Sequence, residues 1–372
     1  MDKLRVGIVF GGRSVEHEVS VASATSILSA LDPHRYEVTL LCVDPTGRWR
    51  LGAPGMLPEQ VEQGVEVRLP AVPDGGTLVR AEGGAPAGRL DVVLPIIHGT
   101  GGEDGSIQGF LELAAVPYVG AGVLGSALQM DKDVAKKLLA AEGLPVVPWV
   151  LVRGAELPSG VDAAVSRAIA ELGLPVFVKP ASLGSSVGIS KARTADDLRR
   201  GLLEAARYDD KILVERAIDA REIEVAVLGN DSPEASVPGE ILPKRDFYDY
   251  ESKYVDEDTD LLVPAPLDDA LTERMRSLAI RAFQILEGAG LARVDFFVER
   301  ESGELWLNEL NSLPGFTEVS MYPRLWQASG LPYPALLDRL LELALERHGS
   351  RMQLERTFRT GSAPEDRGSA EG

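Results

Sequence analysis

The sequence is poor in cysteine, in positive charge and in long apolar runs. Cys42 is the single cysteine among 372 residues, so no intramolecular disulfide can form. It lies inside the apolar run at 38–43, which predicts a buried strand residue rather than a nucleophile. Acidic residues outnumber Lys and Arg by 57 to 38, and the formal net charge is −19. Because nothing offsets phosphate repulsion over the whole surface, we expect no nucleic-acid or anionic-membrane partner.

No apolar run is long enough to span a bilayer. The first residues lead directly into a strand pattern, without the apolar segment and cleavage site of a signal peptide. We therefore expect a cytoplasmic protein with no membrane partner. The length allows two or three domains, and a hydrophobic content of 45% allows sizeable cores, which favours an enzyme.

The first part of the chain alternates between strand and helix patterns. We expect a strand at 6–10, a helix at 18–31, and parallel strands at 38–43 and 92–97. The Gly- and Pro-rich residues 45–90 predict a weakly ordered or peripheral excursion. A helix at 128–142, followed by Gly143 and two prolines, predicts a domain boundary near residue 125.

The rest of the chain has a more compact pattern. The expected elements are a strand at 176–179, a helix from a capping box at 194–197 to about 208, strands at 212–215 and 221–228, and an amphipathic helix at 271–286. The polar and aromatic residues 244–264 show neither the helix period nor the strand period of apolar residues, and they predict a lid-like loop. The tail at 350–372 has little apolar content, and we expect it to be disordered.

Two short strand patterns near the C-terminal end carry the strongest chemical signal. The period of two puts Arg293 and Asp295 on one face of the first strand. It puts Glu309 and Asn311 on one face of the second. Two carboxylates and a carboxamide on a shared face repel one another unless a hard cation lies between them, and Mg²⁺ binds such oxygens together with substrate phosphates. A nucleotide site is predicted; a polar sheet face paired by Arg293 is the alternative.

The loop KPASLGSSVG at 179–188 also points to a nucleotide. Its glycines let backbone N–H groups turn toward a ligand, Ser185 and Ser186 add hydroxyl donors, and Lys179 adds a positive charge at the strand end. A simple turn is the alternative. The loop does not match the P-loop pattern, so a P-loop fold is not expected.

Four motifs follow one another along the chain. They are FGGRSVEHEVS at 10–20, IHGTGGEDG at 97–105, KPASLGSSVG at 179–188 and NELNSLPG at 308–315. Each motif alone is weak. In this order and together, they make the chain resemble the D-alanine–D-alanine ligases of the ATP-grasp superfamily, from about residue 4 to residue 345.

The resemblance implies mixed α/β and α+β structure in the three-domain ATP-grasp fold. An N-terminal Rossmann-like parallel α/β domain would span 1–125, and two ATP-grasp subdomains would span 126–213 and 214–349. An ω-shaped loop would correspond to about 244–264, and 350–372 would form a tail. The family commonly forms homodimers through the N-terminal domain, so we expect a homodimer.

The resemblance implies ATP-dependent synthesis of D-alanyl-D-alanine, a peptidoglycan precursor. The carboxylate of one D-alanine would attack the γ-phosphate of ATP, and the amine of a second would attack the resulting acyl phosphate. Asp295, Glu309 and Asn311 would hold two Mg²⁺ or Mn²⁺ ions. Arg293, assisted by the backbone N–H of Gly315, would stabilise the tetrahedral intermediate. A nucleotide-binding module without chemistry would tolerate the loss of Arg293.

The resemblance also assigns residues to ATP. They are Lys132, Lys179, Ser185 and Ser186 for the phosphates, Glu215 for the adenine edge and Glu222 for the ribose hydroxyls. A solvated charge cluster is the alternative for Lys132. Exposed strand positions are the alternative for Glu215 and Glu222.

For the amino-acid substrates, Glu16 matches the residue that holds the ammonium of the first D-alanine, and His98 one near its carboxylate. A hydrogen bond to the backbone is the alternative for His98. Ser320 and Met321 match contacts to the carboxylate of the second D-alanine, through a hydroxyl and a backbone N–H. Another ATP-grasp ligase would be expected to lack this set.

The resemblance extends to the loop at 244–264. Lys253 would reach the γ-phosphate, and Tyr254 would hydrogen-bond in a network with Ser185 and Glu16, so that closure of the loop excludes water. Relatives that make D-alanyl-D-lactate carry His or Phe at this position, and Tyr254 therefore favours the dipeptide. A ligase that takes D-lactate or D-serine as second substrate is the alternative.

Overall fold

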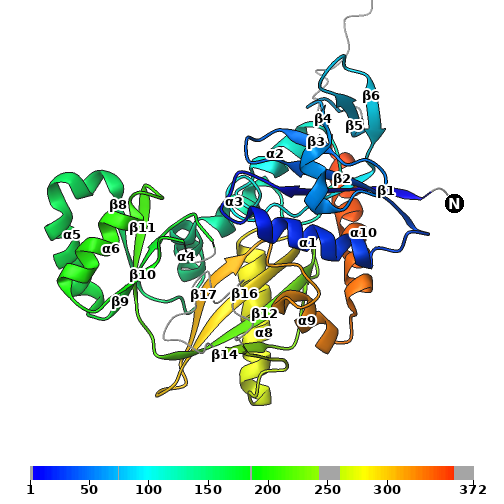
Figure 1. Ribbon diagram of the computed structural model, residues 1–372. Coiled ribbons are helices and arrows are strands. Elements are labelled where there is room, and N and C mark those ends of the chain that lie inside the picture. Colours follow the sequence, from blue (N-terminus) through cyan, green and yellow to red (C-terminus); the bar gives the residue numbers. More distant parts are fainter. Residues whose placement is uncertain (1–2, 74, 185–186, 243–259, 356–372) are drawn as a thin grey trace, which may run out of the picture.

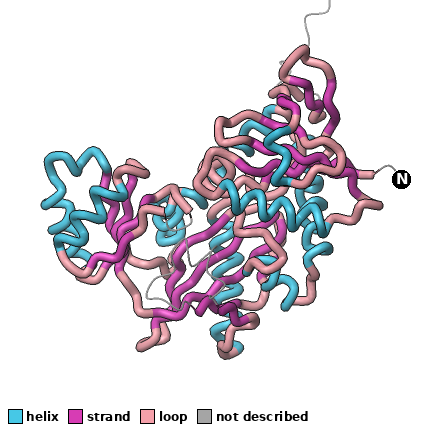
Figure 2. Tube along the Cα trace, in the orientation of Figure 1, coloured by secondary structure: helices cyan, strands magenta, loops and turns pink. Residues whose placement is uncertain are grey.

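Three β-sheets, each with its own helices, make up the described part of the chain (Figure 1). The computed structural model describes residues 3–73, 75–184, 187–242 and 260–355. The second sheet lies at the left in Figure 2, the first at the upper right and the third at the lower centre. No helix among the described residues is long and apolar enough to cross a membrane.

The first sheet has seven strands in the order β6-β5-β4-β3-β2-β1-β7. They are β1 (Leu4–Gly11), β2 (Tyr36–Val43), β3 (Trp49–Leu51), β4 (Val65–Arg68), β5 (Thr77–Arg80), β6 (Pro86–Arg89) and β7 (Val92–Pro95). β1 pairs in parallel with β2 and with β7. The parallel strands predicted for the first part of the chain are therefore confirmed.

The described residues between 45 and 90 include four strands, so the prediction of a weakly ordered excursion is wrong. β3 to β6 extend the sheet by antiparallel pairing and form its edge, where the sequence placed a peripheral segment. Val67, Leu69 and Leu78 are buried in the same core as Leu41 of β2. Each of these strands is only three or four residues long, too short to show a period in the sequence.

Helices from both ends of the chain cover the first sheet. Val6, Ile8 and Phe10 of β1 pack with α1, α9 and α10, while Val9 packs on the opposite face with α2, as the period of two requires. The beginning and the end of the chain therefore share one core. These helices are α1 (His17–Ala30), α2 (Ser106–Leu113), α9 (Met321–Ala328) and α10 (Tyr333–Met352).

α10 continues to Met352, past residue 350 where the tail was predicted to begin. Residues 356–372 lie outside the described part of the chain. The helix predicted at 18–31 is α1, confirmed to within one residue at each end.

The second sheet has four antiparallel strands in the order β10-β9-β11-β8 and is covered by two helices. The elements are β8 (Trp149–Arg153), α5 (Leu157–Leu172), β9 (Val176–Pro180), β10 (Ser190–Ala192), α6 (Ala195–Ala205) and β11 (Lys211–Arg216). The Thr194 hydroxyl accepts from the Asp197 N–H, and the Asp197 carboxylate accepts from the Thr194 N–H. The predicted capping box is confirmed.

The third sheet is antiparallel, with the path β15-β14-β12-β16-β17 and β13 paired to β12. Its elements are β12 (Ala220–Gly229), β13 (Glu234–Ala235), β14 (Gly239–Leu242), β15 (Asp260–Leu262), α8 (Asp269–Ile285), β16 (Gly290–Glu299) and β17 (Leu305–Asn311). Met275, Leu278 and Phe283 bury the predicted apolar face of α8.

β15 falls inside the loop predicted at 244–264, so that prediction is wrong at residues 260–262. β15 is held by pairing with β14. A strand of three residues is too short to show a recognisable pattern in the sequence. Residues 243–259 lie outside the described part of the chain.

The helix predicted at 128–142 is two helices, α3 (Val123–Met130) and α4 (Lys132–Ala141). Asp131 has an extended backbone at the junction, and its carboxylate accepts a hydrogen bond of 3.1 Å from the Val134 N–H. Asp131 therefore ends one helix and caps the next. The apolar period runs on through the junction, which is why the sequence pattern did not show the break.

Cys42 is fully buried in β2, which confirms the predicted strand position. Burial, and then the nearby charge of Glu62, raise the pKa of its thiol to about 12. The thiol is therefore protonated at neutral pH and is not a nucleophile.

The core shared by the two ends of the chain is tested at Leu340. Its side chain is buried in that core, so Leu340→Ala is expected to lower the free energy of unfolding by about 2–5 kcal/mol, from lost apolar burial and the cavity left behind. Denaturant titration measures the change. Leu345→Ala, on the exposed side of the same helix, is the control and should cost little. If both variants lost the same free energy of unfolding, Leu340 would not be part of a core shared by the two ends of the chain.

Candidate functional site

A cleft of about 1430 Å³ lies where the three sheets meet. The candidate residues that fall within the described ranges all line it: Glu16, His98, Lys132, Lys179, Glu215, Glu222, Arg293, Asp295, Glu309, Asn311, Gly315, Ser320 and Met321. Ser185, Ser186, Lys253 and Tyr254 lie outside the described residues.

β16 and β17 carry four polar side chains on the face that lines the cleft. Arg293 lies opposite Asn311 in the antiparallel register, and Asp295 lies opposite Glu309. The Arg293 guanidinium donates two hydrogen bonds of 2.7 Å to the Asp295 carboxylate, and Asn311 Nδ2 donates one of 2.9 Å. The common face predicted from the period of two is confirmed.

Arg293 is held between carboxylates. Its Nε lies 3.0 Å from Glu224 of β12, on the strand next to its own. Burial by itself lowers the pKa of Arg293, but Asp295 and Glu224 outweigh burial and raise the pKa well above its ordinary value. The guanidinium therefore stays charged and keeps its planar set of donors in a fixed place on the cleft wall. Glu224 was not among the predicted site residues. It could have been found from its spacing of two from Glu222, which places both side chains on the same face of the strand.

Asp295, Glu309 and Asn311 provide oxygen ligands suited to a hard cation. Asn311 turns its Nδ2 toward Asp295, so its Oδ1 is the atom able to bind a cation. Glu309 lies 3.5 Å from Lys132 Nζ. Carboxylate and carboxamide oxygens are the donors that Mg²⁺ and Mn²⁺ prefer, so the residues present fit such an ion.

Two lysines contact one buried glutamate of the second sheet, and a third contacts the chain that follows β9. Glu215 of β11 lies 2.6 Å from Lys179 Nζ of β9 and 2.9 Å from Lys136 Nζ of α4. Lys179 also donates to Asn308 Oδ1 at 3.3 Å, which ties β9 to β17. Lys132, the first residue of α4, donates to the Leu183 carbonyl at 2.8 Å.

Burial argues against the alternatives that the sequence left open for Lys132 and Glu215. Lys132 is largely buried and is not part of a solvated charge cluster. Glu215 is buried and is not an exposed strand residue, while Glu222 is half-buried on the cleft wall. Burial raises the pKa of the Glu215 carboxyl, but Lys136 and Lys179 outweigh burial and lower it, so the carboxylate is ionised.

Lys136 supports Glu215 from behind the cleft wall, a role that the sequence analysis did not foresee. Its side chain is 2% exposed, and burial lowers its pKa despite the attraction of Glu215. The neighbouring Lys137 is 57% exposed and pairs with Asp133. Two adjacent lysines on a helix carry no local signal of which one points inward.

Glu16 and His98 come together at the first sheet. Glu16 is buried at the N-cap position of α1, and its N–H donates to Ser14 Oγ at 3.2 Å. His98 Nδ1 lies 3.1 Å from the Leu313 carbonyl, and its Nε2 lies 3.1 Å from Ser23 Oγ. Burial lowers the pKa of His98, so the ring is neutral. The backbone hydrogen bond considered for His98 is therefore present, at the edge of the cleft.

Glu103 is a second residue that was not predicted, although it stands in the motif IHGTGGEDG. Its carboxylate accepts hydrogen bonds from the Gly99 N–H at 2.8 Å and the Leu313 N–H at 3.3 Å. Burial, and then the charge of Glu16, raise the pKa of Glu103 to about 8. The group is thus mostly neutral at pH 7, which limits repulsion beside Glu16.

The start of α9 forms the opposite rim of the cleft. Ser320 Oγ accepts from the Thr317 N–H at 3.1 Å and lies 2.7 Å from Thr317 Oγ1. Met321 is the first residue of α9, so its N–H is among those left without a helical partner. A Cβ at Gly315 would lie 3.3 Å from Ser320 Oγ, so glycine permits this close approach. The rim presents a hydroxyl and N–H donors suited to an anionic group.

Comparison with known proteins adds a family match over most of the chain. Residues 5–121 match the family model described as D-ala D-ala ligase N-terminus, and residues 138–342 match that described as D-ala D-ala ligase C-terminus. The chain is 50% identical over 358 residues to D-alanine--D-alanine ligase A of Chromobacterium violaceum, covering 93% of this chain and 96% of that protein. It is 46% identical over 367 residues to D-alanine--D-alanine ligase of Geobacillus thermodenitrificans, covering 96% and 99%.

Solved structures show the same likeness. The D-alanine-D-alanine ligase from Coxiella burnetii is similar with a TM-score of 0.83 at 38% identity, covering 95% of this chain and 97% of that one. VanG D-Ala:D-Ser ligase from Enterococcus faecalis is similar with a TM-score of 0.82 at 31% identity, covering 92% and 100%. These matches confirm the fold class implied by the four motifs.

The two adjacent lysines of α4 test the buried charge cluster. Lys136→Met leaves Glu215 with one cation instead of two and should lower the free energy of unfolding by about 3 kcal/mol, near the low end for a broken buried pair because Lys179 remains. Lys137→Met is the matched control and should have a small effect. Thermal and denaturant unfolding measure both. A loss no larger in Lys136→Met than in the control would contradict the role given to the cluster.

Proposed function

The chain belongs to the D-alanine–D-alanine ligase family, and we propose that it uses ATP to join two D-alanine molecules into D-alanyl-D-alanine, a peptidoglycan precursor. One observation carries the proposal. A single cleft brings together oxygen ligands for a cation, ammonium groups for phosphates and a buried guanidinium suited to an oxyanion. A protein that only bound nucleotide would have no need of the guanidinium.

The reaction has two steps. The carboxylate of the first D-alanine attacks the γ-phosphorus of ATP, and ADP leaves. The amine of the second D-alanine then attacks the acyl carbon, the bond to phosphate breaks, and the amine loses a proton as the amide forms. Phosphorylation is needed because a carboxylate is a poor electrophile at neutral pH.

Asp295, Glu309 and Asn311 would hold two Mg²⁺ or Mn²⁺ ions, because their oxygens share one face of the cleft. When bound, the ions would neutralise charge on the β- and γ-phosphates. Lys132 and Lys179 would complete this neutralisation, since both reach the same wall.

At the nucleoside end, Glu222 would bind the ribose hydroxyls from its half-buried position on β12. The Glu215 carboxylate is already engaged by two lysines. We therefore assign the adenine edge to Glu215 together with the main chain that follows it on β11. Ser185 and Ser186 would add hydroxyl donors to the phosphates, an assignment that rests on the sequence motif.

The amino acids would bind between the first sheet and α9. Glu16 offers a carboxylate for the ammonium of the first D-alanine, and neutral His98 offers a polar edge near its carboxylate. Ser320 and the Met321 N–H would hold the carboxylate of the second D-alanine at the start of α9. All four residues line the same cleft.

Arg293, with the Gly315 N–H, would stabilise the tetrahedral intermediate of the second step. Its charge is secured by Asp295 and Glu224, so the donors are in place before negative charge develops. Preorganised donors of this kind cost no rearrangement at the moment of reaction.

The remaining assignments rest on the resemblance. Lys253 would reach the γ-phosphate, and Tyr254 would favour an amine over a hydroxyl nucleophile. We propose a homodimer located in the cytoplasm, where ATP is produced. We also propose that the three sheets mark functional units at 1–125, 126–213 and 214–349.

The proposal is tested by substrate-dependent phosphate release. With ATP and Mg²⁺, purified protein should release phosphate only when D-alanine is added, and D-alanyl-D-alanine should appear in equal amount. Glu309→Gln should abolish release, because an oxygen ligand carrying negative charge is lost. Equal rates with L-alanine, or an unchanged rate in the variant, would refute the mechanism. Faster turnover with D-lactate or D-serine as second substrate would favour the alternative ligase.

Arg293→Met tests the oxyanion role. Its kcat should fall on the order of a hundredfold or more, as for the loss of an oxyanion donor. Arg300→Met is the control, because Arg300 lines the same cleft but is exposed and pairs with Asp219. Thermal melts show whether each variant is folded. A folded Arg293→Met variant with unchanged kcat would rule out the role.

A further inference from the structure

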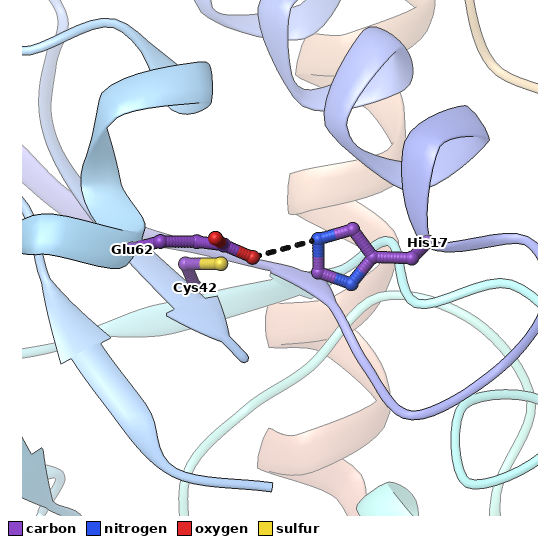
Figure 3. Close-up of side chains that lie close together, drawn as sticks. All are labelled: His17, Cys42 and Glu62. Atoms are coloured by element: carbon purple, nitrogen blue, oxygen red, sulfur yellow. Dashed lines mark ion pairs between the residues drawn. The ribbon is translucent and has the colours of Figure 1, made fainter. Parts of the chain in front are cut away.

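A second group of polar side chains meets on the first sheet, outside the cleft. His17 is the first residue of α1, Cys42 lies on β2, and Glu62 lies on the short 3-10 helix η1 (Pro58–Gln63). Figure 3 shows the three side chains pointing toward one another. None of them is among the residues that line the cleft. The ligase reaction proposed above has no use for them.

The spacing of the group suits a tetrahedral metal site. His17 Nε2, Cys42 Sγ and a carboxylate oxygen of Glu62 all lie within 4.8 Å of one another. His17 Nε2 and Glu62 Oε1 are 3.1 Å apart. With bonds of about 2.0–2.3 Å to nitrogen, oxygen and sulfur, ligand atoms on one Zn²⁺ lie roughly 3.3–3.7 Å apart. Small side-chain adjustments would complete the site.

The backbone orients the imidazole for this purpose. His17 Nδ1 lies 2.9 Å from the Gly12 carbonyl, which can only accept, so Nδ1 carries the proton. In a neutral ring Nε2 then has a lone pair directed at the Glu62 carboxylate. Two lone pairs facing each other at 3.1 Å repel, unless a proton or a metal ion lies between them. An Nδ1–H bonded to a carbonyl is the usual support of a metal-binding histidine.

Gly11, the last residue of β1, leaves room for the group. A Cβ at Gly11 would lie 2.9 Å from His17 Cε1 and 3.2 Å from Cys42 Sγ. Gly11 also has φ of 86°, which favours glycine. Any larger residue at this position would displace the two potential ligands from their present places.

Burial and charge favour a cation that enters from one side. Cys42 is 0% exposed and forms the floor of the group, while the Glu62 side chain is 47% exposed at its mouth. The charged groups that face the thiol are Glu62, Asp44, Glu18 and Arg50. Acidic groups therefore outnumber basic ones. Solvent can reach the mouth and supply a fourth ligand.

We propose that His17, Cys42 and Glu62 form a binding site for a thiophilic divalent cation of the Zn²⁺ type, with water as the fourth ligand. On binding, the thiol proton passes to solvent and sulfur binds as thiolate. Thiolate and imidazole ligands distinguish this site from the all-oxygen site in the cleft. Because His17 directly follows Glu16, the ion would also anchor the start of α1 beside the cleft.

Cobalt binding tests the proposal with a signal that one residue must produce. Co²⁺ is added to the metal-free full chain, without affinity tag, in saturating Mg²⁺ so that the cleft carboxylates are occupied. A thiolate–Co²⁺ charge-transfer band in the near ultraviolet should rise to one ion per chain and disappear when Zn²⁺ is added. Cys42 is the only cysteine in the sequence, so no other residue can give this band.

Three variants complete the test. Cys42→Ser should lose the band, and Glu62→Gln should weaken binding by roughly tenfold or more, since even an outer partner of a metal ligand is worth that much. Glu59→Gln, an exposed position on the same 3-10 helix, is the matched control and should bind as the native chain does. If Cys42→Ser does not fold, Glu62→Gln decides, because its side chain is exposed. If His17 and Glu62 formed only an imidazolium–carboxylate pair, the native chain would show no band, and this result would overturn the proposal. Equal Co²⁺ affinity in Glu62→Gln and Glu59→Gln would also overturn it.

Discussion

Burial of the Glu215 carboxylate is the constraint on which the geometry of the cleft depends. A buried carboxylate is tolerated only where cations and hydrogen-bond donors surround it. Lys136 comes from α4, Lys179 from β9, and Lys179 also donates to Asn308 on β17. The second sheet is therefore joined to α4 by a buried ion pair and to the third sheet by a hydrogen bond from one of the same lysines. Lys179 and Glu215 of this junction line the wall of the cleft.

A different set of contacts holds the side of the cleft that lies between the first sheet and α9. The Leu313 backbone, just after β17, is held at both of its polar atoms by His98 and Glu103, which lie between β7 and α2. Behind it, α9 and α10 share a core with β1 and α1. These contacts hold Glu16, at the start of α1, and Arg293, on β16, at fixed positions relative to each other. A reaction in which two substrates and a phosphoryl group must meet depends on such fixed positions.

Local patterns predicted those features that local physics controls. The period of two placed Arg293, Asp295, Glu309 and Asn311 on one face, and the capping box at Thr194 marked a helix start, because backbone geometry alone produces both. Prediction failed where pairing partners decide the structure. The short strands within 45–90 and β15 exist because neighbouring strands hold them. The break at Asp131 was hidden because the apolar period continues across it.

By itself, the sequence determined the family, several of the strands and helices, and most of the polar residues expected in the cleft. Tertiary structure alone decided how the side chains pair: Lys136 rather than Lys137 with Glu215, Glu224 with Arg293, and Glu103 with the Leu313 backbone. It also decided that Cys42 meets His17 and Glu62. These partners come from separate elements of the chain. The charge state of each side chain depends on its burial and on the charges of its partners. Burial and partners are both absent until the sheets have packed together.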